Sequence, residues 1–172
     1  MRPSVIWLTG LSEAGKTSIA NKLANELRTE HCKPIVLDGE LMRTILQVQG
    51  YDEATRKEYN RVIARLASYL QITGHTVIVA LISPYKKVRD EAREICNNFF
   101  EIYVATDLKT CIERDSKGLY AKAMLGEISN VTGISAPYEP PVHPELVLNA
   151  GVLSVTECVA AIVDLLGHKP EA

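Results

Sequence analysis

The sequence lacks any apolar run of the roughly 20 residues that a membrane-spanning helix needs. Its N-terminal apolar run is interrupted by Gly10 and is too short for a signal peptide. The chain also lacks a large excess of either charge. Its formal net charge of −2 at pH 7 provides no general attraction to nucleic acid or anionic lipid. We therefore expect no nucleic-acid partner and no membrane partner.

Cysteine is scarce, and the four cysteines are far apart in the chain. None of them forms the C-x-x-C spacing that is typical of metal and redox sites. Isolated cysteines of this kind are usually buried structural thiols, and such thiols stay reduced in the cytosol. The pattern favours a cytoplasmic protein. The cysteines are Cys32, Cys96, Cys111 and Cys158.

No linker, internal repeat or low-complexity tract divides the 172 residues, so we expect one domain, residues 1–172. Apolar runs suited to buried strands alternate with helical patterns, which predicts an α/β fold: a parallel sheet with helices on both faces. The expected strands are Val5–Thr9, Pro34–Leu37, Thr76–Leu81, Phe99–Val104 and Leu146–Leu148. The expected helices, besides one after the first strand, cover residues 53–73, 86–97, 107–115 and 154–166.

Residues 10–17 follow the pattern G-x-x-x-x-G-K-[ST] of a phosphate-binding loop, between an apolar run and a helical repeat. In such a loop, backbone N–H groups converge on phosphate oxygens. Lys16 adds a positive charge, and the Thr17 hydroxyl can bind Mg²⁺. A chance match at a glycine-rich turn is the alternative. The residues expected to contact ATP are Gly10, Leu11, Ser12, Glu13, Ala14, Gly15, Lys16, Thr17 and Ser18.

Polar residues also follow two later strands, and ligands of doubly wound sheets bind beyond the carboxyl ends of the strands. Asp38 can accept a proton from an attacking hydroxyl or hold Mg²⁺ through water. Its alternative role is the N-cap of a helix that begins at Glu40. Arg43 and Arg56 suit bidentate capture of phosphate or sulfate, although ordinary surface arginines would explain them equally well.

Residues 116–144 are rich in glycine and proline and have little periodicity beyond a short helical pattern at Leu119–Met124. A long irregular segment in a compact domain is often a lid. Lys117 and Lys122 would bring positive charge over bound phosphates. A solvated surface loop is the alternative.

These motifs together resemble the adenylylsulfate kinase (APS kinase) family, nearly from end to end. The segments that carry the resemblance are Thr9–Ser12, Leu37–Glu40, Arg43, Ile82–Tyr85, Arg114–Asp115, Lys117–Tyr120, Lys122–Ala123, Thr132–Ile134 and Pro137–Glu139. The resemblance implies a P-loop kinase that uses ATP and Mg²⁺. Its acceptor would be the ribose 3′-hydroxyl of adenylylsulfate, in sulfate activation. Members of this family are often dimers, so the resemblance also implies a homodimer.

The resemblance implies a catalytic set of Lys16, Asp38 and Ser83, and it places Arg114 near the base of ATP. Ser83 matches a serine that is sometimes described as a phosphoenzyme intermediate. Direct in-line transfer needs only positioning and charge, so a structural turn or a substrate contact is the alternative for Ser83. The residues implied in acceptor binding are Asp38, Glu40, Arg43, Tyr51, Arg56, Tyr59, Ile82, Ser83, Lys117, Lys122, Val131 and Thr132.

Several departures from the family pattern fall in the expected acceptor pocket. Tyr59 replaces an asparagine, Met124 replaces an arginine, and Val131 replaces an aromatic residue that would form half of an adenine sandwich. Loss of one stacking face is expected to cost about 1–3 kcal/mol of base binding. The departures leave two alternatives open. One is a P-loop kinase with a different nucleotide or small-alcohol acceptor, and the other is a non-catalytic nucleotide-binding regulator.

Overall fold

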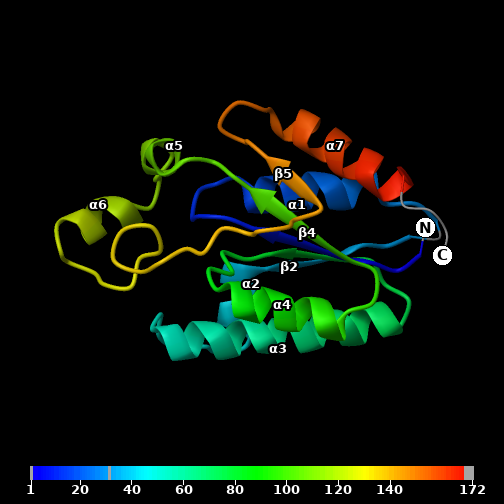
Figure 1. Ribbon diagram of the computed structural model, residues 1–172, viewed down its shortest axis with the longest axis horizontal. Helices are drawn as coiled ribbons and strands as arrows, with labels where there is room; N and C mark the ends of the chain where they lie inside the picture. The colour runs from blue at the N-terminus through cyan, green and yellow to red at the C-terminus, as the bar shows by residue number, and fades with distance from the viewer. Residues whose placement is uncertain (1, 31, 169–172) are drawn as a thin grey trace.

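The computed structural model describes residues 2–30 and 32–168, and Figure 1 shows a central sheet between two layers of helices. The sheet has five strands in the order β2-β3-β1-β4-β5, and each neighbouring pair is parallel. The predicted parallel α/β fold is therefore confirmed. The strands are β1 (Val5–Thr9), β2 (Ile35–Asp38), β3 (Val77–Ala80), β4 (Phe99–Val104) and β5 (Leu146–Leu148).

The predicted helices are present, with ends that shift by one or two residues. The strand predicted to begin at Pro34 begins at Ile35 and continues to Asp38. A short helix, α2, follows this strand at once. No helix in the described part of the chain combines the length and the apolarity that crossing a bilayer requires. The helices are α1 (Lys16–Glu26), α2 (Gly39–Ile45), α3 (Glu53–Ile72), α4 (Lys86–Ile95), α5 (Leu108–Glu113), α6 (Leu119–Met124) and α7 (Val155–His168).

The central strand β1 is buried on both faces, as expected for a parallel strand with helices on either side. Successive side chains of a strand point to opposite faces. Ile6 and Leu8 pack in the apolar cluster that includes residues of α1 and α7. Val5 and Trp7 pack in the cluster that includes residues of α3. The alternation along one five-residue strand thus joins the two halves of the core.

The carboxyl ends of the parallel strands meet at one edge of the sheet. After β3 the chain crosses to the other side of β1, because β2 and β3 lie on one side of that strand and β4 and β5 on the other. Such a switch point opens a crevice beyond the strand ends, which is the usual ligand position in this architecture. The phosphate loop and Ser83 follow strands at this edge, and Asp38 is the last residue of β2.

Residues 116–144, predicted to be a lid or a solvated surface loop and called the lid segment below, contain α6 and an isolated bridge between Thr132 and Ala136. The C-terminal end of the lid segment is tied to the sheet by Arg89, whose residue exposure is 1%. The guanidinium of Arg89 pairs with Glu101 on β4, with Nε 2.6 Å from the carboxylate. It also donates to the carbonyls of Ser83 (2.6 Å) and Glu139 (2.7 Å). One buried cation therefore joins the turn after β3 to the lid segment.

Replacement of Arg89 by leucine is expected to lower the free energy of unfolding by about 3 kcal/mol, because it leaves a buried carboxylate at Glu101 without its main partner. Arg93, 3.5 Å from Glu101, limits the loss. Urea unfolding followed by circular dichroism measures the change. The control is Arg65→Leu at the exposed Arg65–Glu58 pair, where a loss below about 1 kcal/mol is expected. Equal losses for the two variants would contradict the role of Arg89.

Candidate active site at the strand ends

The phosphate loop joins β1 to α1, in the context that its sequence pattern predicts. At Gly10 a Cβ atom would lie 2.4 Å from the carbonyl oxygen of Val104, so only glycine fits between the loop and β4. Gly15 has a φ of +102°, and Glu13 has a φ of +57°, which is uncommon for a residue with a side chain. The loop therefore has a tightly determined backbone before any ligand binds.

Lys16 begins α1, and only 8% of its surface is exposed. Its ammonium group donates to the carbonyl oxygen of Leu11, within the same loop. Burial lowers the pKa of Lys16 to about 8, and the nearby Cys111, Glu13 and Asp38 only partly oppose this shift. A bound triphosphate would supply the negative charge that this site lacks.

Asp38 lies beside the phosphate loop and also caps a helix. Its Oδ2 accepts a hydrogen bond from the Thr17 hydroxyl at 2.7 Å. Its Oδ1 accepts from the backbone N–H groups of Glu40 (3.0 Å) and Leu41 (3.2 Å), at the start of α2. The two roles considered from the sequence are therefore compatible, because they use different oxygens. The cap fixes the carboxylate in place.

The Thr17 hydroxyl and the Asp38 carboxylate are hard oxygen donors of the kind that Mg²⁺ prefers. Within residues 2–30 and 32–168, no group of three or more His, Cys, Asp or Glu side chains is arranged to hold a metal ion. This donor set fits Mg²⁺, which usually keeps several waters and binds through one or two protein oxygens together with substrate phosphates.

Three aromatic and basic residues expected in acceptor binding form one assembly. The guanidinium carbon of Arg43 lies 4.4 Å from the centre of the Tyr51 ring and 4.5 Å from that of Tyr59. Tyr59 is buried, and its hydroxyl donates to the carbonyl of Gly39 at 2.6 Å. Tyr51 is 58% exposed. Tyr59 therefore supports Arg43 from the protein interior, whereas the Tyr51 ring lies at the surface.

Arg56 is buried, and its guanidinium is used largely within the protein. Its Nε donates to the carbonyl of Tyr51 at 2.7 Å, and its other nitrogens donate to Thr132 Oγ1 and the Asn130 carbonyl. Burial lowers the pKa of Arg56. Arg56, which the sequence predicts to bind an anion, thus joins α3 to the lid segment. A guanidinium has five N–H groups, so Arg56 can also donate to a ligand.

Ser83 is buried and its hydroxyl is engaged on both sides. It donates to Asn60 Oδ1 at 2.7 Å and accepts from the indole N–H of Trp7 at 3.0 Å. The backbone of Ser83 has a φ of +45°. This geometry favours the structural turn over a phosphoenzyme intermediate. Ile82, beside it, accepts hydrogen bonds from Thr9 and Gly10 through its carbonyl.

The remaining predicted residues divide into those that reach the site and those that face elsewhere. Lys117 of the lid segment pairs with Glu40 of α2, and this hydrogen bond raises the pKa of Lys117. Arg114 donates to the carbonyl of Ala150 at 2.8 Å, at the end of α5. Lys122 is exposed on α6. Val131, which stands where the family pattern has an aromatic residue, is buried in the larger apolar cluster.

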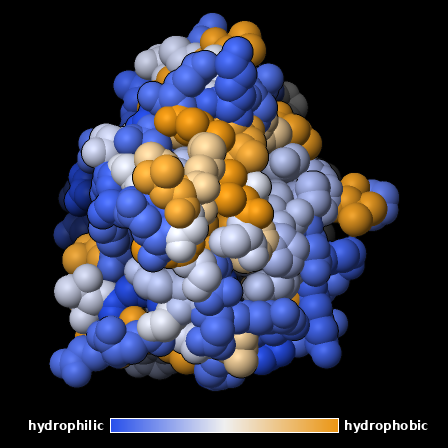
Figure 2. Space-filling model, turned by 90° about the vertical axis from the view of Figure 1, so that its left-hand side faces the viewer, coloured by the Kyte–Doolittle hydropathy of each residue, from blue (hydrophilic) through white to orange (hydrophobic). Residues whose placement is uncertain are grey.

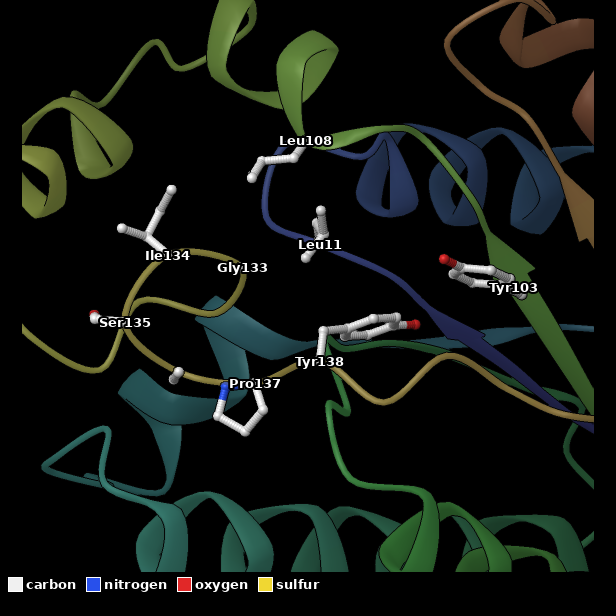
Figure 3. A pocket seen from close by; sticks show the side chains of 9 residues that line it. Leu11, Tyr103, Leu108, Gly133, Ile134, Ser135, Pro137 and Tyr138 are labelled. Carbon is white, nitrogen blue, oxygen red and sulfur yellow. The ribbon is translucent and has the colours of Figure 1, made fainter.

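The lid segment rests directly on the phosphate loop. A Cβ atom at Gly133 would lie 3.2 Å from the side chain of Leu11 and 3.3 Å from that of Leu108. An open groove of about 540 Å³ lies beside this contact, and Figure 3 shows Tyr138 and Tyr103 on its other side. Figure 2 shows a central apolar area on this side of the molecule, within a mostly hydrophilic surface.

Two residues that sequence reasoning did not select also contact the phosphate loop. Thr106 donates to the carbonyl of Ala14 at 2.8 Å, and Tyr120 donates to that of Ser12 at 3.0 Å. These contacts join residues 92 and 108 positions apart, so no local pattern could reveal them. Tyr120 lies in a stretch that carried the family resemblance, which was the available signal.

Comparison with known proteins gives consistent results. The family model described as adenylylsulphate kinase matches residues 2–149. An adenylyl-sulfate kinase of Bacillus velezensis is 45% identical over 171 residues, which cover 98% of this chain and 87% of that protein. One of Pseudomonas entomophila is 43% identical over 171 residues, covering 98% of this chain and 82% of that protein. A Mycobacterium tuberculosis APS kinase structure in complex with AMPPNP and APS matches with a TM-score of 0.91 and 38% identity, covering 96% of this chain and 98% of that chain.

The buried ammonium of Lys16 predicts that ATP affinity falls as the pH rises above about 8. Bound phosphates favour the charged form, so the pKa of Lys16 is higher in the complex than the value of about 8 in the free protein. Above pH 8 the free protein must therefore take up a proton to bind, and affinity falls by up to about tenfold per pH unit. Isothermal titration calorimetry at pH 7 to 9.5, in buffers of different ionisation enthalpy, measures both effects.

Lys16→Arg is the matched control, because arginine stays charged throughout this pH range. It should show no proton uptake from this position, whatever its absolute affinity. A Kd that stays constant up to pH 9.5 in the unsubstituted protein would contradict the prediction.

Proposed function

The chain belongs to the adenylylsulphate kinase family, and we propose that it phosphorylates the ribose 3′-hydroxyl of adenylylsulfate with ATP through Lys16, Thr17 and Asp38. The product is 3′-phosphoadenylylsulfate, the activated form of sulfate. The observation that carries the assignment of residues is the 2.7 Å contact between the Thr17 hydroxyl and the Asp38 carboxylate. It brings the donor loop and the candidate base within one hydrogen bond of each other.

The donor site is the phosphate loop with its buried lysine. ATP phosphates accept hydrogen bonds from the loop N–H groups, and Lys16 neutralises charge on the β- and γ-phosphates. Thr17, and Asp38 through water, would hold Mg²⁺, which would further neutralise the phosphates. Arg114, which donates to the carbonyl of Ala150, would contact the base of ATP.

The acceptor site lies between α2, the start of α3 and the lid segment. Asp38 accepts the proton of the 3′-hydroxyl as the hydroxyl oxygen bonds to the γ-phosphorus and the bond from that phosphorus to the bridging oxygen breaks, which releases ADP. Tyr51 stacks on the adenine, and Arg43 beneath it binds the phosphosulfate. Because Val131 is buried in the apolar cluster, stacking in this arrangement uses one face of the base.

The lid segment completes the site around the two nucleotides. Lys117 pairs with Glu40 in the structure, and bound phosphates offer it a stronger partner. Arg56 holds Asn130 and Thr132 over the acceptor side. Transfer of Lys117 from Glu40 to the phosphates would close the lid in response to substrate and exclude water from the γ-phosphate.

Asp38→Asn is expected to lower kcat by about 10²- to 10⁴-fold, because it removes a general base, with a much smaller change in the KM for adenylylsulfate. ADP release with Mg²⁺, ATP and adenylylsulfate measures both constants. Lys16→Ala defines the inactive background. Asp107→Asn changes the N-cap of α5 in the same way and should leave kcat nearly unchanged. No ADP release above background in the unsubstituted protein would overturn the proposed function, and an unchanged kcat in Asp38→Asn would reduce Asp38 to a helix cap.

Tyr51→Ala is expected to raise the KM for adenylylsulfate by about five- to 150-fold, which corresponds to a stacking contribution of about 1–3 kcal/mol. The KM for ATP should change little, because Tyr51 lies on the acceptor side. Tyr69→Ala is the control, since Tyr69 is an equally exposed tyrosine on the outer part of α3 (64% exposed). Steady-state kinetics with each substrate varied in turn separates the two effects. A rise in both KM values would contradict the placement of the acceptor.

A further inference from the structure

Two peptide groups of the phosphate loop are held from outside the loop by side-chain hydroxyls. The Tyr120 hydroxyl donates to the carbonyl oxygen of Ser12 at 3.0 Å, and the Thr106 hydroxyl donates to that of Ala14 at 2.8 Å. Both side chains are buried, at 0% and 4% exposure. Burial also raises the pKa of the Tyr120 phenol, so it remains a hydrogen-bond donor at any physiological pH. Neither hydroxyl is part of the sequence motif.

The planarity of the peptide bond converts these contacts into a constraint on the opposite side of the loop. The described chain contains no cis peptide bond, and in a trans peptide the C=O and the following N–H point in opposite directions. A fixed Ser12 carbonyl therefore fixes the Glu13 N–H, and a fixed Ala14 carbonyl fixes the Gly15 N–H. Each N–H points away from the hydroxyl that holds its peptide.

Glu13 and Gly15, the residues that carry these N–H groups, both have left-handed backbone conformations, with φ of +57° and +102°. This conformation is unfavourable for a residue such as glutamate, which has a Cβ atom. For the loop by itself, holding the Ser12–Glu13 peptide in this orientation would cost conformational free energy. An external hydrogen bond to that peptide is therefore a determinant of its direction.

We propose that Thr106 and Tyr120 are positioning residues that turn the Glu13 and Gly15 N–H groups into the triphosphate site. The inference rests on the proposed function, since it assigns the means by which the donor loop is held ready for ATP. The two hydroxyls come from different elements: Thr106 follows β4, and Tyr120 lies in α6 of the lid segment. They act on alternate peptides, so each one controls a different N–H group.

The Tyr120 contact also joins the lid segment to the donor loop. Asp115, just before the lid segment, accepts hydrogen bonds from the backbone N–H groups of Leu119 (2.9 Å) and Tyr120 (2.7 Å). This cap fixes the start of α6, and Tyr120 then connects α6 to Ser12. The hydrogen bonds of Asp115 and Tyr120 therefore fix the start of α6 to the phosphate loop.

Two substitutions test the proposal with minimal change in volume: Tyr120→Phe and Thr106→Val. Each removes one hydroxyl and should raise the Kd for MgATP by about three- to tenfold, the loss expected for one hydrogen bond. Inorganic tripolyphosphate should lose affinity by the same factor, because the affected N–H groups contact phosphate and not the base. The KM for adenylylsulfate should change less than twofold. Rescue of affinity in Thr106→Ser would confirm that the hydroxyl is the active group.

The controls are Tyr69→Phe and Thr76→Val, which remove hydroxyls from the exposed side of α3 and from the residue before β3, away from the loop carbonyls of Ser12 and Ala14. They should leave both Kd values unchanged. Thermal unfolding without ligand, measured for all variants, separates positioning from general stability. A lower Tm with unchanged Kd values in Tyr120→Phe and Thr106→Val would overturn the proposal. So would a loss of ATP affinity without a loss of tripolyphosphate affinity.

The binding assay needs no acceptor, which keeps this test separate from that of the proposed function. A protein that fails to turn over adenylylsulfate but loses tripolyphosphate affinity in both variants would retain the positioning role and lose the kinase assignment. Turnover of adenylylsulfate by the unsubstituted protein, with unaltered binding in both variants, would support the kinase assignment and overturn the positioning role.

Discussion

The site is organised around one buried positive charge, the ammonium group of Lys16. With 8% of its surface exposed and the Leu11 carbonyl as its one hydrogen-bond partner among the described residues, Lys16 has lost most of its hydration, and nearby charges offset this only in part. Its lowered pKa, about 8, is the measurable consequence. A bound polyanion would supply the missing counter-charge, and the surrounding loop has the sequence pattern of a phosphate-binding loop. Phosphate binding would thus offset the desolvation free energy of the buried ammonium group, which favours binding.

The phosphate loop depends on supports that lie far away in the sequence. Gly10 fits under the Val104 carbonyl only because it has no side chain, and Thr106 and Tyr120 hold two of the outward carbonyls. On the acceptor side, Asp38 is fixed by the N-terminus of α2 while its second oxygen contacts Thr17. The groups proposed to act on the donor and on the acceptor are therefore fixed to the same frame, as in-line transfer between two bound nucleotides would require.

The departures from the family pattern have a clear physical form in the structure. Tyr59 does not occupy a ligand surface. It is buried, supports Arg43 with its ring and binds the Gly39 carbonyl with its hydroxyl, so it adds rigidity beneath the exposed Tyr51. Asn60, the next residue, uses its amide to join Arg56 to Ser83. Val131 packs in the core. Tyr51 is thus the exposed ring of this assembly, and Arg43 and Tyr59 support it from beneath.

The sequence by itself determined the order of strands and helices, the phosphate loop and the strand-end position of Asp38. These features follow from local periodicity and from a motif whose residues are adjacent in the chain. The tertiary structure alone decided which way each side chain faces: that Val131 enters the core, that Ser83 is saturated by Trp7 and Asn60, and that Arg56 holds the lid segment. It also selected Thr106 and Tyr120 as the supports of the loop. Such contacts join residues up to 108 positions apart, and only the packing of the whole sheet brings them within hydrogen-bond distance.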